Sequence, residues 1–134
     1  MKKLTNKKGF TLAELLVVVA IIAVLVAVSI PVFGTQLEKA KDATSVANLR
    51  AAYAEASAAY LTGEASGNAT VSGSKVTVSG VVIESSDTNY GTAGDNLPFT
   101  FTAVAKGTYT LEFTFLSNGS VKVTATSTKT STNE

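Results

Sequence analysis

Residues 10–33 read FTLAELLVVVAIIAVLVAVSIPVF, and Glu14 is the only charged residue among these 24. The 19 residues from 15 to 33 carry no charge. As a helix they would rise about 28 Å, which is close to the hydrocarbon thickness of a bilayer. A helix that is apolar on every side is unsuited to the surface of a small soluble domain. The segment is therefore predicted to enter lipid or the core of a larger assembly.

A short basic leader, residues 1–9, precedes this apolar segment. It contains no acidic residue and four cations, Lys2, Lys3, Lys7 and Lys8. Such a charge bias retains an N-terminus in the cytoplasm, so the C-terminal domain is predicted to lie on the outer side of the cell membrane. A secretory signal would place small residues at a cleavage site after its apolar core, and the sequence from Ser29 to Gly34 is a poor match to that pattern. We therefore expect the apolar helix to stay with the mature chain.

The string KGFTLAE, residues 8–14, resembles the prepilin signal of type IV pilins and their relatives. In that family a membrane-embedded aspartyl peptidase cuts after the glycine and methylates the new N-terminal amine. The resemblance implies cleavage between Gly9 and Phe10 and N-methylation of Phe10. It also implies an α+β fold, the pilin fold, in which a long N-terminal helix packs against a small antiparallel β-sheet.

Glu14 is the unusual residue of the apolar segment, because an ionisable group within a membrane costs several kcal/mol unless it finds a partner. One interpretation is a glutamate at the membrane interface whose carboxylate reaches the headgroups. The family resemblance implies another, in which the amine of Phe10 on one subunit neutralises Glu14 of its neighbour. That pairing would set the axial register of subunits in a filament.

The helix is predicted in two parts, an apolar part over residues 10–34 that projects and an amphipathic part over residues 35–62 that packs on the sheet. In the second part Val46, Leu49, Tyr53, Ala56 and Tyr60 recur at spacings of three and four residues. The two tyrosines are expected in the core rather than at a ligand. Pro31 lacks a backbone N–H and clashes with the preceding turn, so a kink is expected there.

Residues 63–134 are predicted to form the antiparallel β domain. Alternating apolar and polar residues predict strands over residues 75–84, 99–104, 108–116 and from residue 121, with a bulge at Gly80. Hairpin turns are expected at residues 105–107 and at Asn118-Gly119. Residues 64–74 are predicted to be a polar loop. Residues 85–98 form a second long connection, which is the most plausible place for an adhesive contact.

Composition argues against several functions. The chain has no histidine and no cysteine, which removes the commonest general base, the thiol nucleophile and any disulfide, so we do not expect an enzyme or a cofactor. Without the leader lysines the chain has 7 cations and 10 acids, a net charge of −3, which argues against a general nucleic-acid-binding surface. Four residues of the second connection offer oxygen ligands for Ca²⁺, but their spacing favours a solvated loop over a metal site. They are Asp87, Asn89, Asp95 and Asn96.

Three functional classes follow, in order of preference. The first is the major structural subunit of a type IV pilus, anchored in the cell membrane before assembly and displayed on the cell surface afterwards. The second is a pseudopilin of a type II secretion or competence (DNA-uptake) system. The third is a plain membrane-anchored binding protein, which would not be cleaved at Gly9. For the first two the resemblance implies four kinds of partner: other copies of the chain, a prepilin peptidase, an assembly ATPase and a membrane platform protein.

Overall fold

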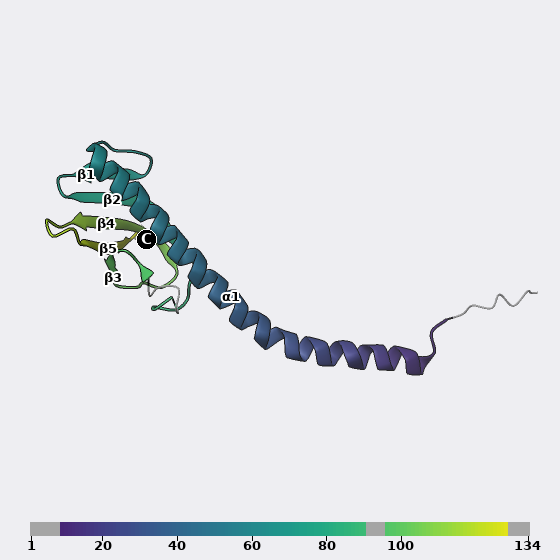
Figure 1. The fold of residues 1–134 in the computed structure, drawn as a ribbon. Coiled ribbons are helices and arrows are strands. Elements are labelled where there is room, and N and C mark those ends of the chain that lie inside the picture. Colours follow the sequence, from purple (N-terminus) through teal and green to yellow (C-terminus); the bar gives the residue numbers. More distant parts are fainter. Residues whose placement is uncertain (1–8, 91–95, 129–134) are drawn as a thin grey trace, which may run out of the picture. The chain divides into compact units, whose positions relative to one another are not determined.

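The computed structural model describes residues 9–90 and 96–128, and the chain divides into two compact units, residues 1–36 and 37–134. Residues 1–8 of the predicted leader lie outside the described residues. Helix α1, Leu12–Thr62, contributes residues to both units (Figure 1). It is followed by five strands in the second unit.

Helix α1 ends at Thr62, directly before Gly63. Gly63 has a φ of 72°, and its N–H donates to the Ala59 carbonyl over 2.8 Å, which closes the last turn. Glycine adopts this left-handed conformation without the penalty of a Cβ. The helix continues through Pro31. Because proline has no N–H, the carbonyl of Ala27 loses its usual helical donor, and the kink at Pro31 stays a prediction.

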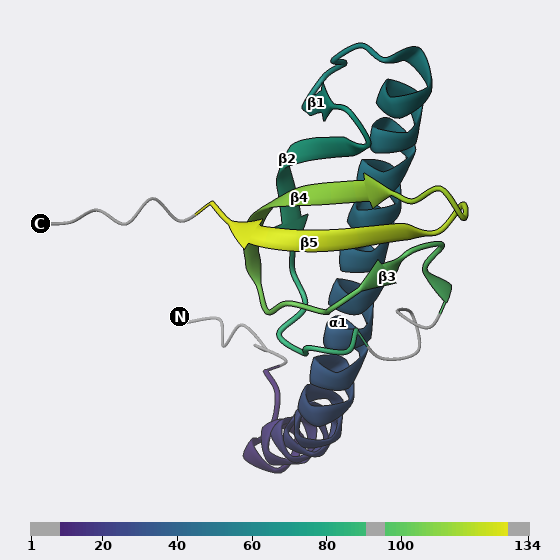
Figure 2. The same ribbon diagram turned by 90° about the vertical axis from the view of Figure 1, so that its left-hand side faces the viewer.

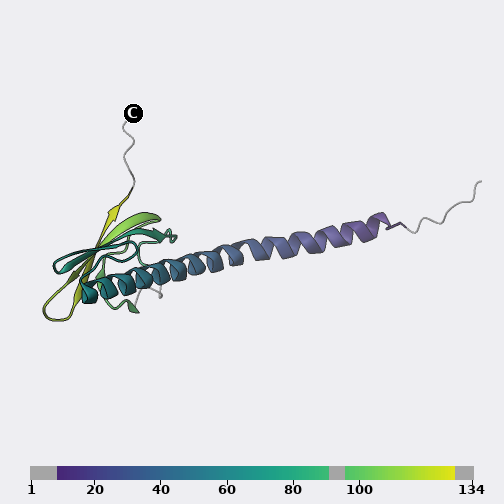
Figure 3. The same ribbon diagram turned by 90° about the horizontal axis from the view of Figure 1, so that it is seen from above.

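The five strands form one sheet in the order β1-β2-β4-β5-β3 (Figure 2). The strands are β1 (Ala69–Ser72), β2 (Lys75–Ile83), β3 (Thr100–Phe101), β4 (Gly107–Phe115) and β5 (Val121–Ser127). All neighbouring pairs are antiparallel except β3 with β5. Within this unit the second part of α1 runs along one face of the sheet (Figure 3). The predicted α+β class is therefore confirmed.

Local sequence signals account for three of the strands. β2, β4 and β5 match the predicted alternating segments, and Asn118-Gly119 forms the turn between β4 and β5, with a φ of 84° at Gly119. The register between β2 and β4 shifts between Val78 and Val81, which confirms the bulge at Gly80. Gly80 has a φ of 75°, a conformation that favours glycine.

Two predictions about the sheet were wrong. Strand β1 lies within residues 64–74, which were expected to be loop. The expected hairpin between residues 99–104 and 108–116 is absent from the described sheet, because β3 is short and pairs in parallel with β5. The cause lies at Val104, whose backbone N–H and carbonyl both bond to the Tyr90 hydroxyl instead of to a strand.

The core lies between the sheet and the second part of α1. Tyr53 lies among aromatic rings, 5.3 Å from Phe99 and 6.2 Å from Phe113 between centroids, and Phe99 meets Phe113 edge-on at 5.7 Å. Tyr60 stacks on Phe115 at 4.2 Å. Fully buried residues from the helix and the sheet belong to the same core: Leu49, Ala56, Val76, Ile83 and Leu111. Tyr53 therefore packs against the core, as predicted, whereas Tyr60 is 39% exposed and stacks on the sheet outside the core, so the prediction was wrong for Tyr60.

Buried polar side chains tie α1 to the chain that follows β2. The Ser45 hydroxyl accepts bonds from the backbone N–H groups of Glu84 and Ser85, each over 2.9 Å. The Ser85 hydroxyl donates to the Asp42 carboxylate, and all three of Asp42, Ser45 and Ser85 are buried. The start of the 85–98 connection is therefore fixed to the helix. Residues 91–95 of that connection, including Asp95, lie outside the described residues.

An exposed carboxylate adds a pH-sensitive contact to this attachment. The Ser86 N–H donates to Glu38 Oε1 over 3.0 Å, and the Ser86 hydroxyl donates to the same oxygen. These bonds, with Lys41 nearby, lower the pKa of Glu38. A carboxylate with a lower pKa in the folded state stabilises that state above its unfolded pKa, and the contribution is lost as the pH falls through the folded pKa.

We therefore predict that acid loosens the Ser86 attachment. Amide exchange of residues 84–87, corrected for the intrinsic rate, should be faster at pH of about 3 than at pH of about 6, on either side of the ordinary glutamate pKa. Hydrogen-exchange mass spectrometry measures it. Glu38→Gln should exchange faster at pH 6 and lose most of the pH difference. An unchanged difference in this variant would assign the effect to another carboxyl group.

Tyr90 holds a later part of the same connection, residues 85–98, to the backbone of Val104. It is buried, it has a φ of 54°, which is uncommon for a bulky residue, and burial raises its pKa. Its hydroxyl donates to the Val104 carbonyl over 2.7 Å and accepts from the Val104 N–H over 2.9 Å. One side chain thus satisfies both polar groups of a backbone position that has no strand partner.

Tyr90→Phe should lower the free energy of unfolding by about 1–3 kcal/mol, because both Val104 groups lose their partner while the ring is kept. Urea unfolding of the full chain in detergent micelles, followed by circular dichroism, measures the change. Tyr109→Phe is the matched control, because its hydroxyl makes one exposed bond, to the Ala105 carbonyl at 2.7 Å. The control should lose about 0.5 kcal/mol, and equal losses in the two variants would contradict the special role of Tyr90.

Candidate functional site

The candidate site is the start of α1, where the sequence predicts cleavage, methylation and assembly. Gly9, Phe10 and Thr11 precede the helix, and all three are exposed. Phe10 is 84% exposed. The Gly9–Phe10 peptide bond therefore lies outside the helix, as a peptidase needs, because helical backbone must unwind before it fits an extended binding cleft.

Glu14 bonds to the backbone of its own helix start. The Thr11 N–H donates to Glu14 Oε2 over 3.0 Å, and the Glu14 N–H donates to Thr11 Oγ1 over 3.3 Å. This reciprocal arrangement is a capping box, and a carboxylate there also interacts favourably with the positive end of the helix dipole. In a single chain Glu14 thus has a local partner before any second copy is present.

This role of Thr11 was not predicted from the sequence. Threonine and glutamate three residues apart, ahead of an apolar run, form the capping-box pattern, so the signal was present in residues 11–14. Phe10 and Glu14 lie in the same short segment, as expected. The pairing of the Phe10 amine with Glu14 is a contact between two copies, and it stays a prediction.

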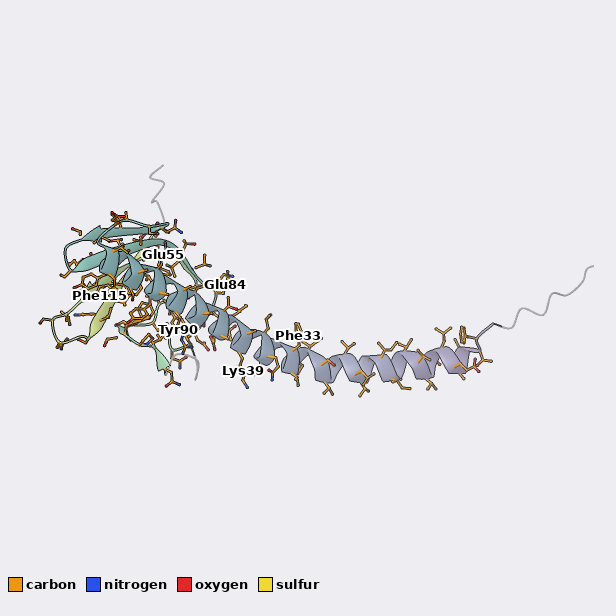
Figure 4. All side chains as sticks on the ribbon, turned by 45° about the horizontal axis from the view of Figure 1, so that its top comes forward. Phe33, Lys39, Glu55, Glu84, Tyr90 and Phe115 are labelled. Carbon is orange, nitrogen blue, oxygen red and sulfur yellow. The ribbon has the colours of Figure 1, made fainter. Side chains whose placement is uncertain are left out.

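The helix beyond Glu14 exposes apolar side chains on every side. The large apolar residues from Leu15 to Phe33 are each 47–69% exposed. Figure 4 shows such side chains all around this part of α1, ending at the labelled Phe33. In the part of the chain that the structure describes, α1 is the helix long and apolar enough to cross a membrane. This surface is consistent with anchoring in a membrane.

Three carboxylates meet beside the 85–98 connection. Oxygen atoms of Glu38, Asp42 and Asp87 lie within 4.8 Å of one another. Asp87 comes from the loop considered above for Ca²⁺, whereas Glu38 and Asp42 come from α1, so the grouping was not visible in the sequence. Glu38 and Asp42 already accept hydrogen bonds from Ser86 and Ser85. These bonds give the two acids a structural role in holding the connection.

A family model described as the prokaryotic N-terminal methylation motif matches residues 4–30. Residues 4–30 therefore carry the N-terminal signal found in type IV pilin-like proteins. The matched segment is the class III signal of type IV pilins and pseudopilins, which confirms the resemblance of residues 8–14 to a prepilin signal. No curated protein and no solved structure matches the chain. Phe10 and Glu14 both lie within the matched residues.

Proposed function

We propose that this protein is the major structural subunit of a type IV pilus, with no catalytic activity of its own. The observation that carries the proposal is the exposed apolar surface of α1 between Leu15 and Phe33. Exposing such a surface to water costs free energy in proportion to its apolar area. The surface must therefore lie in lipid or against other apolar helices. A filament made of many copies supplies the second environment after the membrane has supplied the first.

The start of the helix supplies the register of that filament. Cleavage after Gly9 would leave the Phe10 amine as a new cation, four residues before Glu14. In an apolar core an unpaired carboxylate is costly, and the amine of a neighbouring copy would neutralise it. Assembly would then exchange the contact of Glu14 with the Thr11 N–H for a charged contact between copies.

The proposed life cycle requires partners outside the chain. A prepilin peptidase would cleave between Gly9 and Phe10 and methylate Phe10. An assembly ATPase and a membrane platform protein would then move the subunit from the cell membrane into the filament. The β domain would lie outside the membrane throughout and would end on the surface of the pilus.

Intact-mass spectrometry of fibres sheared from the source cells tests this function. A dominant species that begins at N-methylated Phe10 is the expected result. The same species confined to the membrane fraction would instead favour a pseudopilin of a secretion or DNA-uptake system. An uncleaved chain in the membrane would overturn both and leave a membrane-anchored binding protein.

A further inference from the structure

A hollow of about 220 Å³ lies between α1 and β2, beside the bulge at Gly80. Its lining mixes small apolar residues with polar side chains, among them Asn48, Ala51, Glu55, Asn68 and Ser79. Glu55 is the charged residue of this lining. In Figure 4 it lies on α1 beside the first strands of the sheet. The hollow therefore combines a cavity of side-chain size with one carboxylate.

The carboxylate of Glu55 is held in place by the turn before β1. The Asn68 N–H donates to Glu55 Oε1 over 2.6 Å. Gly67 has a φ of 59°, and a Cβ at this position would lie only 2.5 Å from the same oxygen. Among the described residues no bond to Glu55 Oε2 is found. Glu55 is thus fixed through one oxygen and can accept a cation through the other.

The face of α1 beside the hollow is exposed and carries a heptad pattern. Its residues alternate at spacings of three and four: Leu37, Ala40, Thr44, Ala47, Ala51, Ala54, Ala58 and Leu61. All eight are exposed, and the leucines at the two ends are 46% and 84% exposed. The buried residues Asp42, Leu49 and Ala56 lie on the opposite side of the helix. A repeat of 3.5 residues is the pattern by which two helices pack along each other.

We propose that the hollow binds the Arg50 guanidinium of a second copy of this chain, with the two exposed α1 faces packed in parallel and in register. In a parallel pair the residues on one flank of the contact lie opposite residues on the other flank of the partner helix. Each lies opposite the partner residue five positions later in the sequence. Arg50 and Glu55 are five residues apart and flank the heptad face on its two sides. Two Arg50–Glu55 contacts would therefore form, one in each direction.

The charges distinguish this arrangement from the antiparallel one. Antiparallel packing centred on the same face would bring the two Arg50 side chains towards each other, which is unfavourable. Arg50 uses one donor in its own chain, from Nη2 to the Asn96 carbonyl over 3.1 Å. A guanidinium has five N–H donors, so donors remain for the Glu55 of a partner.

The membrane anchor favours the same arrangement. The inference rests on one part of the proposed function, the anchoring of each copy in the membrane. Two copies anchored in the same orientation have parallel helices. Confinement to the membrane also raises the effective concentration of the two faces, so a weak contact suffices. The alanines of the face allow close approach of the two helices, at the short end of the usual 8–10 Å between axes. Pairing does not require polymerisation.

Disulfide cross-linking tests the arrangement, because the chain contains no cysteine. The full chain carrying Ala47→Cys or Ala54→Cys is expressed in the membrane of cells without pilus assembly components and is then oxidised. Identical positions on a parallel pair lie close enough for a disulfide, whose Cα atoms are about 4.4–6.8 Å apart. Each variant should form at least about fivefold more covalent dimer than Lys122→Cys, an exposed control on the sheet.

Equal dimer from the control would mean random collision and would overturn the pairing. So would cross-linking that occurs only between Ala47→Cys and Ala51→Cys chains in a mixture, which indicates antiparallel packing. Because no filament is needed, loss of the dimer in cells that still make normal pili would refute the pairing and leave the proposed function intact.

A double-mutant cycle tests the role of the hollow. Glu55→Gln keeps an oxygen for the Asn68 N–H and removes the charge, and Arg50→Gln removes its partner. Each change should lower cross-linking through Ala54→Cys about fivefold, and the two together should lower it no further. Two losses that multiply, or no loss at all, would show that Arg50 and Glu55 do not meet across the pair.

Discussion

Glu14→Ala should leave the chain in the membrane and cleaved after Gly9 but lower the yield of surface pili by more than about tenfold, because the Phe10 amine of each neighbour would be left unpaired in an apolar core. Cleavage should persist because Gly9 and Phe10 lie before the helix and are exposed. Mass spectrometry of the membrane fraction measures processing, and quantification of sheared fibres measures assembly.

Thr11→Ala separates the two contacts of Glu14. It removes the hydroxyl that accepts the Glu14 N–H but keeps the carboxylate. We expect a less stable helix start, by about 1 kcal/mol, with pili still formed. If the loss of pili in Thr11→Ala equalled that in Glu14→Ala, the helix cap, and not a contact between copies, would explain both. Normal piliation in Glu14→Ala would refute the role of this residue in assembly.

Phe113→Ala should destabilise the second unit by about 3–5 kcal/mol, a large part of the stability of a small domain. Phe113 is fully buried, and its ring contacts the rings of Tyr53 and Phe99. The helix and the sheet would both lose contacts, because Tyr53 lies on α1 and Phe99 precedes β3. Urea unfolding of the full chain in detergent micelles measures the loss.

Lys122→Ala is the control for this change. Lys122 lies on β5 next to buried Val121 and Val123 and points to the opposite, exposed side of the sheet. Its replacement should change stability by no more than about 0.5 kcal/mol. A small effect of Phe113→Ala would mean that the aromatic cluster is not the main attachment of α1 to the sheet.

The long helix and three of the strands could be predicted because their signals are local. The absence of charge from residues 15–33, the spacing of Leu49 and Ala56, and the alternation in β4 each act within one element. Asn118-Gly119 also specifies its turn locally, although only Gly119, with a φ of 84°, adopts the positive φ that was expected at both positions. The prepilin resemblance is likewise contained in seven consecutive residues.

The remaining features depend on contacts between distant residues. β1 is a short edge strand among glycine, serine and asparagine, and only its pairing with β2 makes it a strand. β3 pairs in parallel with β5, and the backbone groups of Val104 bond to Tyr90, 14 residues earlier in the chain. The position of Glu55 depends on Gly67, 12 residues later, and the grouping of Glu38 with Asp87 depends on the attachment at Ser85. A pattern within one short stretch of sequence cannot show contacts between residues so far apart in the chain.

The bridge from Tyr90 to Val104 has a consequence for the redox conditions in which the protein can fold. It closes a loop of 14 residues with hydrogen bonds from one phenol, where a secreted domain commonly uses a covalent cross-link. Because the chain has no cysteine, it has no disulfide bond. Its folding therefore needs neither an oxidant nor a disulfide isomerase, and a reductant has no disulfide to break. The β domain should therefore reach the same fold in anaerobic and in oxygenated surroundings.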